Sequence, residues 1–250
     1  MPQDLSTSFI GRLRARDPKA WFELWETFGP VLSAQLRRWG RGRIGPETVQ
    51  DLSQETLTAL AQAIDSHDPS RGVRFSTWLL AIARYTLSDE FDRRNAQKRG
   101  EGRRPVELDE FLVPGSDAPG PDEDYHRLVL GAKVDAAVRR VERQVDFLDF
   151  EVFRCRVLEG QSGVEVATAL GTSEATISRR LARVRDVLRV QLAEVIGQYS
   201  FSEEDVEDLG RNGIDLSPNK ALDALFDEAV GEVHRRYLAQ RALLDSASRE

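Results

Sequence analysis

The sequence predicts an all-α protein: two helical domains, an acidic flexible linker between them, and a helical C-terminal extension. Three observations lead to this prediction. Apolar residues recur every three or four positions through most of the 250 residues. Residues typical of helix starts and stops bracket these stretches. Residues 105–124 alone interrupt the pattern, and no alternating pattern or internal repeat competes with it.

Composition narrows the class of protein. The chain has 42 Asp and Glu against 35 Lys and Arg, a formal net charge of −7. Proteins that bind DNA alone are usually basic, because affinity comes largely from neutralised phosphates. An acidic chain with local basic patches therefore indicates DNA binding with the help of a partner. The one cysteine, Cys155, excludes an internal disulfide. With neither a leader pattern nor a membrane span, this favours a cytoplasmic protein.

The N-terminal domain, residues 1–104, is predicted to consist of helices separated by loops rich in proline and glycine. Asp17 is a helix cap followed by proline at the first helical position. We expect Gly29-Pro30 to kink or break the helix that follows, because proline removes a backbone donor. The later boundaries are a loop at Gly40–Gly45, a helix from Pro46 to about Ile64, a loop at His67–Arg74 and a helix from Phe75 to about Lys98.

Residues 105–124 differ in composition from both flanks. They contain four prolines and seven acidic residues, with no lysine or arginine. Such a segment buries too little apolar area to fold alone, so we expect a flexible linker. Helical periodicity returns at Tyr125 and defines a second domain, residues 125–198.

Residues 162–185 predict a helix-turn-helix within that second domain. Ser162 and Glu165 fit a capping box, Gly171 is the helix stop, and Ser173 caps the second helix. The face opposite the apolar stripe of the second helix is basic, as in a helix that enters the major groove of DNA. A helical hairpin with a solvated basic face is the alternative. The apolar sides are Val164, Val166, Ala167 and Leu170 in the first helix, and Ile177, Leu181, Val184 and Leu188 in the second.

The C-terminal extension, residues 199–250, has its own helix signals. We expect caps at Ser202 and at Ser217-Pro218. Acidic residues outnumber basic ones, so direct DNA binding is not expected. The extension can cover basic surfaces of its own chain or bind a regulator, and a helical cap on the neighbouring domain is the interpretation we favour. Its apolar side is Leu222, Leu225, Phe226, Ala229, Val233, Tyr237 and Leu244.

Three blocks, in their order and separation, resemble bacterial RNA polymerase sigma factors of the extracytoplasmic-function group. They are DLSQETL (Asp51–Leu57), FSTWLLAIARYTLSDEFDRR (Phe75–Arg94) and VFRCRVLEGQSGVEVATALGTSEATISRRLARVR (Val152–Arg185). The resemblance covers about residues 17–98 and 125–195 and leaves out the extension. It implies an initiation factor that binds core RNA polymerase, selects promoters at their −35 and −10 elements, and melts the −10 DNA.

The resemblance assigns the first block to polymerase binding. Asp51, Gln54 and Glu55 lie on the side of their helix away from its apolar residues. They would dock on the clamp helices of the largest polymerase subunit, where arginines would pair with the carboxylates. A second contact is expected with the flap of the second-largest subunit. Without the resemblance, a plain solvated face is the preferred interpretation.

The second block is assigned to the −10 element. Aromatic residues interleaved with cations suit separated DNA strands, because bases stack on rings while cations track phosphates. Trp78 has core spacing with Ile82, and we favour a core role for it over a DNA contact. Tyr85 and Asp92 depart from the residues common in the family, so the −10 sequence is left open. The candidates are His67, Arg71, Arg74, Ser76, Trp78, Arg84, Tyr85 and Ser88.

The third block is assigned to the −35 element. Its arginines are suited to guanine, which offers two acceptors in the major groove. In this family the linker threads the polymerase cleft and RNA exit path; a passive tether is equally compatible with its composition. The candidates for −35 recognition are Thr176, Ser178, Arg179, Arg180, Ala182 and Arg183.

Two other classes of protein are less compatible with this sequence. A free-standing, dimeric helix-turn-helix regulator is disfavoured by the acidic charge and by the Asp51–Leu57 block. A nuclease or hydrolase is disfavoured because His67, His126 and His234 lack metal-ligand spacing, and because the chain has no Gly-rich phosphate loop. We expect no catalytic residue, metal or cofactor. The promoters, the inducing signal and any anti-sigma partner are left open.

Overall fold

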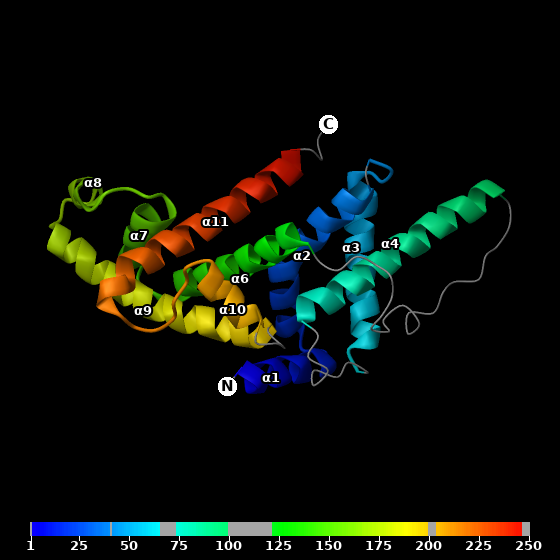
Figure 1. The fold of residues 1–250 in the computed structure, drawn as a ribbon, viewed down its shortest axis with the longest axis horizontal. Coiled ribbons are helices and arrows are strands. Elements are labelled where there is room, and N and C mark those ends of the chain that lie inside the picture. The colour runs from blue at the N-terminus through cyan, green and yellow to red at the C-terminus, as the bar shows by residue number, and fades with distance from the viewer. Residues whose placement is uncertain (1, 41, 66–73, 100–121, 200–203, 247–250) are drawn as a thin grey trace.

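The computed structural model describes residues 2–40, 42–65, 74–99, 122–199 and 204–246. These segments are helices and short connections without a strand, which confirms the all-α prediction. The N-terminal domain holds α1 (Pro2–Arg14), α2 (Pro18–Gly40), α3 (Pro46–Ala63) and α4 (Phe75–Arg99). The second domain holds α6 (Glu123–Gln144), α7 (Phe147–Phe153), the π-helical turn η2 (Arg154–Leu158), α8 (Gly163–Ala169) and α9 (Glu174–Tyr199). The extension holds α10 (Glu204–Arg211), the 3₁₀ turn η3 (Lys220–Leu222) and α11 (Asp223–Ser246) (Figure 1).

The helix signals of the helix-turn-helix are confirmed. The Ser162 hydroxyl accepts from the Glu165 N–H at 3.2 Å, and the Glu165 carboxylate accepts from the Ser162 N–H at 2.7 Å, which completes the capping box. Gly171 has a φ of 60°, the left-handed conformation that glycine adopts without steric cost. The Ser173 hydroxyl accepts from the Thr176 N–H at 3.3 Å. Local chemistry therefore sets the geometry of the turn.

We expected Gly29-Pro30 to kink or break the helix. A break is wrong, because α2 continues through both residues. Proline lacks an N–H, so the carbonyl one turn earlier, that of Glu26, loses its helical donor. Nη2 of Arg139, from α6, lies 3.4 Å from that carbonyl oxygen. A neighbouring helix thus supplies a replacement donor, which the local sequence does not show.

Three other expectations need correction. The linker was placed through Asp124, but α6 already begins at Glu123, with the Asp122 side chain as its cap. Asn219, not Ser217, caps the turn before α11, because its carboxamide reaches the N–H of Ala221. Val164, Leu170 and Leu225 are exposed although they were assigned to apolar sides. The other expected cap, Ser202, and most of the linker lie outside the described residues.

Helix α1, absent from the prediction, brings the two domains together. Its Phe9, Ile10 and Leu13 are buried, and α1 packs along α9. The centre of this contact is Tyr199, at the last turn of α9, whose ring lies 5.0 Å from those of both Phe9 and Phe28. Aromatic pairs at such distances and edge-on angles are stabilising beyond the area they bury. The N-terminal helices thus share a core with α9.

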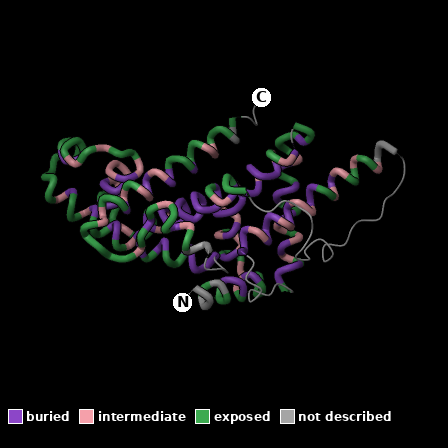
Figure 2. The backbone as a smooth tube through the Cα atoms, viewed as in Figure 1, coloured by how far each residue is buried: buried purple, intermediate pink, exposed green. Residues whose placement is uncertain are grey.

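Helix α6 lies at the centre of the molecule. It packs on α9, on α2 and on α11, so residues from Leu128 to Val138 are buried on every side (Figure 2). This explains why its sequence shows so weak an amphipathic pattern: a helix covered all round needs no polar face. Lys133 and Asp135 are the charged residues buried within that stretch.

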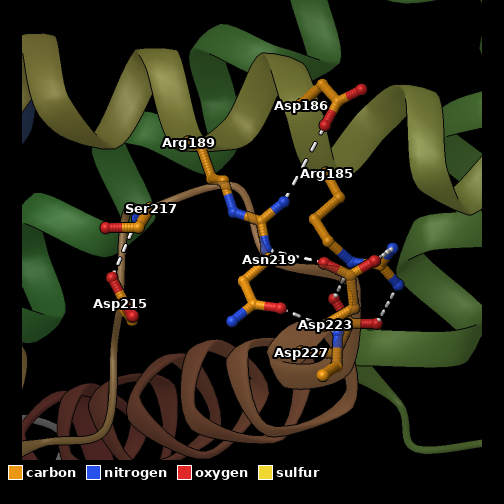
Figure 3. A network of polar contacts seen from close by, with 9 residues as sticks. Arg185, Asp186, Arg189, Asp215, Ser217, Asn219, Asp223 and Asp227 are labelled. Carbon is orange, nitrogen blue, oxygen red and sulfur yellow. Dashed lines mark hydrogen bonds and ion pairs between the residues drawn. The ribbon is translucent and has the colours of Figure 1, made fainter.

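The extension is anchored on α9 by a group of buried ion pairs (Figure 3). The Arg185 guanidinium donates to Asp227 through Nε and Nη2, at 2.8 and 2.6 Å, and to Asp223 through Nη1 at 2.8 Å. Nη2 of Arg189 reaches the other Asp223 oxygen at 2.7 Å, and the Arg189 guanidinium stacks on the Phe226 ring. The extension therefore forms the helical cap on the second domain that we favoured.

Candidate functional site

The predicted polymerase-binding residues lie on an open groove between α3 and α4. Asp51, Gln54 and Glu55 are exposed and line one wall of a hollow of 520 Å³. Arg93 and Arg94 of α4 form the facing wall. The structure thus brings all three predicted residues together on one accessible surface.

Glu90, which the sequence analysis did not single out, fixes the far wall of this groove. Its carboxylate is buried and pairs with Arg93 and with Arg94, the latter at 2.5 Å. Burial alone would raise the pKa of Glu90, but hydrogen bonds from the two arginines outweigh it and lower that pKa. Nη2 of Arg94 also donates to the Thr48 hydroxyl at 3.0 Å and so links α4 to α3. The sequence does contain a signal for these pairs: Arg93 and Arg94 follow Glu90 by three and four residues, the spacing at which side chains on a helix contact one another.

The predicted −35 residues lie along one side of α9, near its N-terminal end. Ser178, Arg179, Ala182 and Arg183 are exposed, while Thr176 and Arg180 are half-buried. The opposite stripe of Ile177, Leu181, Val184 and Leu188 is buried, as predicted. In Figure 1 this end of α9 lies with α8 at one extreme of the molecule, away from the N-terminal helices. The geometry leaves this surface open to a large partner.

Asp149 of α7, also absent from the prediction, contacts two of those arginines. Its side chain is 11% exposed. Arg183 donates to it through Nε at 2.9 Å and Nη2 at 3.0 Å, and Nη1 of Arg180 makes a third contact. The hydrogen bond from Arg183, the largest cause, lowers the pKa of Asp149, so the group is a carboxylate at neutral pH. More than 30 positions separate the partners, so no local pattern could have revealed the contact.

The predicted −10 residues are mostly covered in this structure. Trp78 is buried, in agreement with the core role favoured for it, and Ser76 is 2% exposed. The hydroxyl of Tyr125, from α6, donates to the Ser76 carbonyl at 2.7 Å. Nη1 of Arg74 pairs with the Asp208 carboxylate of α10 at 2.8 Å. Helices α6 and α10 therefore lie over the start of α4.

The other −10 candidates are distributed differently. Arg84 stacks over the Trp39 ring, with its guanidinium carbon 4.6 Å from the ring centroid. Tyr85 is half-buried and Ser88 is exposed on the same helix. His67 and Arg71 lie outside the described residues. The six candidates that the structure describes therefore do not form one open surface.

Comparison with known proteins identifies the chain's relatives. A model of the family described as Sigma-70 region 2 matches residues 24–97, from the second turn of α2 almost to the end of α4. The chain is 28% identical to the RNA polymerase sigma factor NccH of Alcaligenes xylosoxydans xylosoxydans over 177 residues, 70% of this chain and 88% of the relative. It is 27% identical to the sigma factor CnrH of Cupriavidus metallidurans over 195 residues, 76% and 96% of the two chains. It is 33% identical to the ECF sigma factor SigE of Mycolicibacterium smegmatis over 150 residues, 58% and 52% of the two chains.

The chain therefore carries a Sigma-70 region 2 and is similar to RNA polymerase sigma factors, one of them of the extracytoplasmic-function group. The family match contains the whole of the α3–α4 groove, with Asp51, Gln54 and Glu55. In the described segments, no helix is apolar over enough residues to cross a bilayer. Nor do these segments bring together three side chains of the types that could hold a metal ion.

Proposed function

We propose that three surfaces of this chain divide the work of a transcription initiation factor, which directs core RNA polymerase to promoters. The α3–α4 groove binds the polymerase, α9 reads the −35 element, and the start of α4 engages the −10 DNA. The match to Sigma-70 region 2 over the groove is the observation that carries this assignment. In this proposal the polymerase, and not this chain, carries out the bond-forming chemistry.

The groove suits a cationic partner. Asp51 and Glu55 project exposed carboxylates from α3, and Arg93, the nearest cation to Glu55, lies at 3.9 Å. Their charges are therefore largely available to arginines of the polymerase clamp helices, which are the proposed partner. Such charge-assisted pairs give register as well as affinity.

The second domain offers an apolar surface for another polymerase contact. Phe147 and Leu148, at the start of α7, are 73% and 44% exposed, and Val164 of α8 is 58% exposed. Exposed large apolar residues that adjoin one another, as Phe147 and Leu148 do, are typical of an interaction site. We assign them to the flap of the second-largest polymerase subunit.

Engagement of the −10 DNA requires this structure to open. Arg74 and Ser76 lie beneath α10 and α6. DNA strands reach the start of α4 only after those helices move away. The described conformation is therefore that of the unbound factor, in which the polymerase groove and the −35 surface are accessible while the −10 surface is covered.

The groove is tested by Asp51→Ala combined with Glu55→Ala. We expect association with core polymerase to weaken at least about tenfold, because two charge-assisted contacts are lost. The control is Glu47→Ala with Asp65→Ala, which removes the same charge from exposed positions at the two ends of α3. Affinities are measured by titrating labelled protein with core polymerase. Equal affinities for the two double variants, or tight binding of an operator by the isolated chain, would contradict the proposed function.

A further inference from the structure

The arginines of the −35 surface are not equivalent. Arg183 has its Nε and one Nη engaged by Asp149, and Arg180 contacts the same carboxylate. Arg179 is exposed, and it donates within its own helix, to the Ala175 carbonyl at 3.2 Å and the Thr176 hydroxyl at 3.3 Å. Asp149 therefore distinguishes two restrained cations from one that is free to turn outward.

The difference matters because of how arginine reads a base. Recognition of guanine uses two N–H groups of one guanidinium edge, aimed at two acceptors. In Arg183 the edge formed by Nε and Nη2 already binds Asp149. The N–H groups that remain on Arg183 can approach a phosphate, which a single donor satisfies. In Arg179 the same edge contacts a carbonyl and a hydroxyl, which are neutral acceptors and hold it less strongly than the carboxylate of Asp149 holds Arg183.

The charge balance leads to the same division. One ionised, nearly buried carboxylate lies between two guanidinium groups. It cancels part of their attraction for the DNA backbone, which is the component of binding that does not depend on sequence. Removing that carboxylate charge would release both side chains and increase the local positive potential.

We propose that Asp149 is a positioning residue for promoter reading. It holds Arg180 and Arg183 against α7 as phosphate-facing cations and leaves Arg179 to read a base pair. The inference rests on the proposed assignment of α9 to the −35 element. It adds that selectivity depends on a residue of α7 that does not lie on the reading helix.

The test uses full-length protein in complex with core polymerase. The probes are a random-sequence duplex, and duplexes selected by the wild-type complex from a library randomised over the −35 positions. Asp149→Asn is expected to bind the random duplex about three- to tenfold more tightly, with a salt dependence steeper by about one phosphate contact. Its discrimination among single-base changes in the selected duplex is expected to fall. Arg179→Ala should lose discrimination mainly at one base pair, by about 5- to 150-fold.

Two variants serve as matched controls. Asp146→Asn removes the same charge from the cap of the same helix; this side chain is 68% exposed and lies 3.9 Å from Arg180. It should behave as wild type. Asp149→Glu keeps the charge and should restore much of the selectivity. If Asp149→Asn does not fold, Arg183→Lys replaces it, because lysine keeps the charge at an exposed position but cannot form the forked contact.

The outcomes distinguish the positioning role of Asp149 from the assignment of α9 to the −35 element. If Asp149→Asn matches Asp146→Asn in salt dependence and in base discrimination, or if Arg183→Lys leaves both unchanged, Asp149 has no positioning role. If the wild-type complex selects no sequence from the library and Arg179→Ala changes nothing, the assignment of α9 itself fails. Selection by the wild type and loss with Arg179→Ala, without an effect at Asp149, contradicts this inference alone.

Discussion

At the scale of the residue, His234 of α11 shows how burial and neighbouring charges set the protonation state of a side chain. Its Nε2 lies 3.2 Å from an Asp135 oxygen, but that carboxylate already pairs with Arg139. Burial, together with the charges of Arg139 and Arg235, lowers the pKa of His234 to about 4. The ring is therefore neutral at physiological pH.

This neutral histidine predicts a pH dependence of stability. In an unfolded chain, histidine has a pKa of about 6.5. Between about pH 6.5 and pH 4, His234 therefore binds a proton in the unfolded chain but not in the folded one. The free energy of unfolding should therefore fall as the pH falls through this window, by up to about 1.4 kcal/mol per pKa unit. Urea denaturation at several pH values measures it. His234→Gln should flatten the dependence, and an unchanged slope would rule out His234 as its source.

At the scale of the element, the ion pairs of Figure 3 attach the extension to α9. Arg185 is 8% exposed, and a buried guanidinium that loses its carboxylates is costly. The pKa of Arg185 is raised above the usual value for arginine, and the hydrogen bonds that Arg185 donates to Asp227 are the largest cause. The start of α11 is therefore held by charge, in contrast to its later turns, where Tyr237 packs closely on Gly131.

Asp227→Asn should loosen the start of α11. We expect a loss of about 3 kcal/mol, at the low end for a broken buried ion pair because Asp223 still contacts Arg185. Hydrogen exchange of the amides of η3 and early α11, together with urea denaturation, measures the effect. Asp215→Asn is the control, since that exposed carboxylate accepts a hydrogen bond from the Ser217 N–H in the turn before η3. Similar exchange rates in the two variants would contradict the role given to Asp227.

Elements defined by local chemistry were predictable, and those defined by distant partners were not. The caps at Ser162 and Ser173 and the stop at Gly171 are confirmed because each depends on residues within a few positions. Helix α1 was missed because its apolar residues bury against α9, far along the sequence. The exposure of Asp51 and Glu55 followed from helical periodicity, whereas the contacts of Asp149 depend on how α7 meets α9. Helical periodicity indicates which face of a helix is buried, but not which other element packs against that face.

At the scale of the whole molecule, the charge distribution fits the described conformation, in which α10 lies over the start of α4. Residues 201–250 contain twelve Asp and Glu against six Lys and Arg, so they carry −6 of the net charge of −7. One of these acids, Asp208, covers Arg74, a candidate −10 residue. The extension was not expected to bind DNA directly, and one of its carboxylates instead faces a cation of the same chain that is assigned to DNA.

Asp208→Asn should ease the opening of this arrangement. The buried pair with Arg74 is weakened, so α10 should leave the start of α4 more readily. We expect promoter opening by the reconstituted polymerase complex to quicken about fivefold, equivalent to ~1 kcal/mol. A fluorescent base analogue at the −10 position of a promoter obtained by transcription of genomic fragments measures it. Glu207→Gln, an exposed neighbour on α10, is the control; equal opening rates would show that α10 is no barrier.

Helix α9 bears both the surface assigned to the −35 element and, 20 positions after Arg179, the tyrosine that enters the aromatic core of the N-terminal domain. At 1.5 Å per residue it is a rod about 39 Å long. A tilt of this helix at the end assigned to DNA would move Tyr199 at its other end. Contact with the −35 element would then be coupled to the packing of Tyr199 against Phe9 and Phe28.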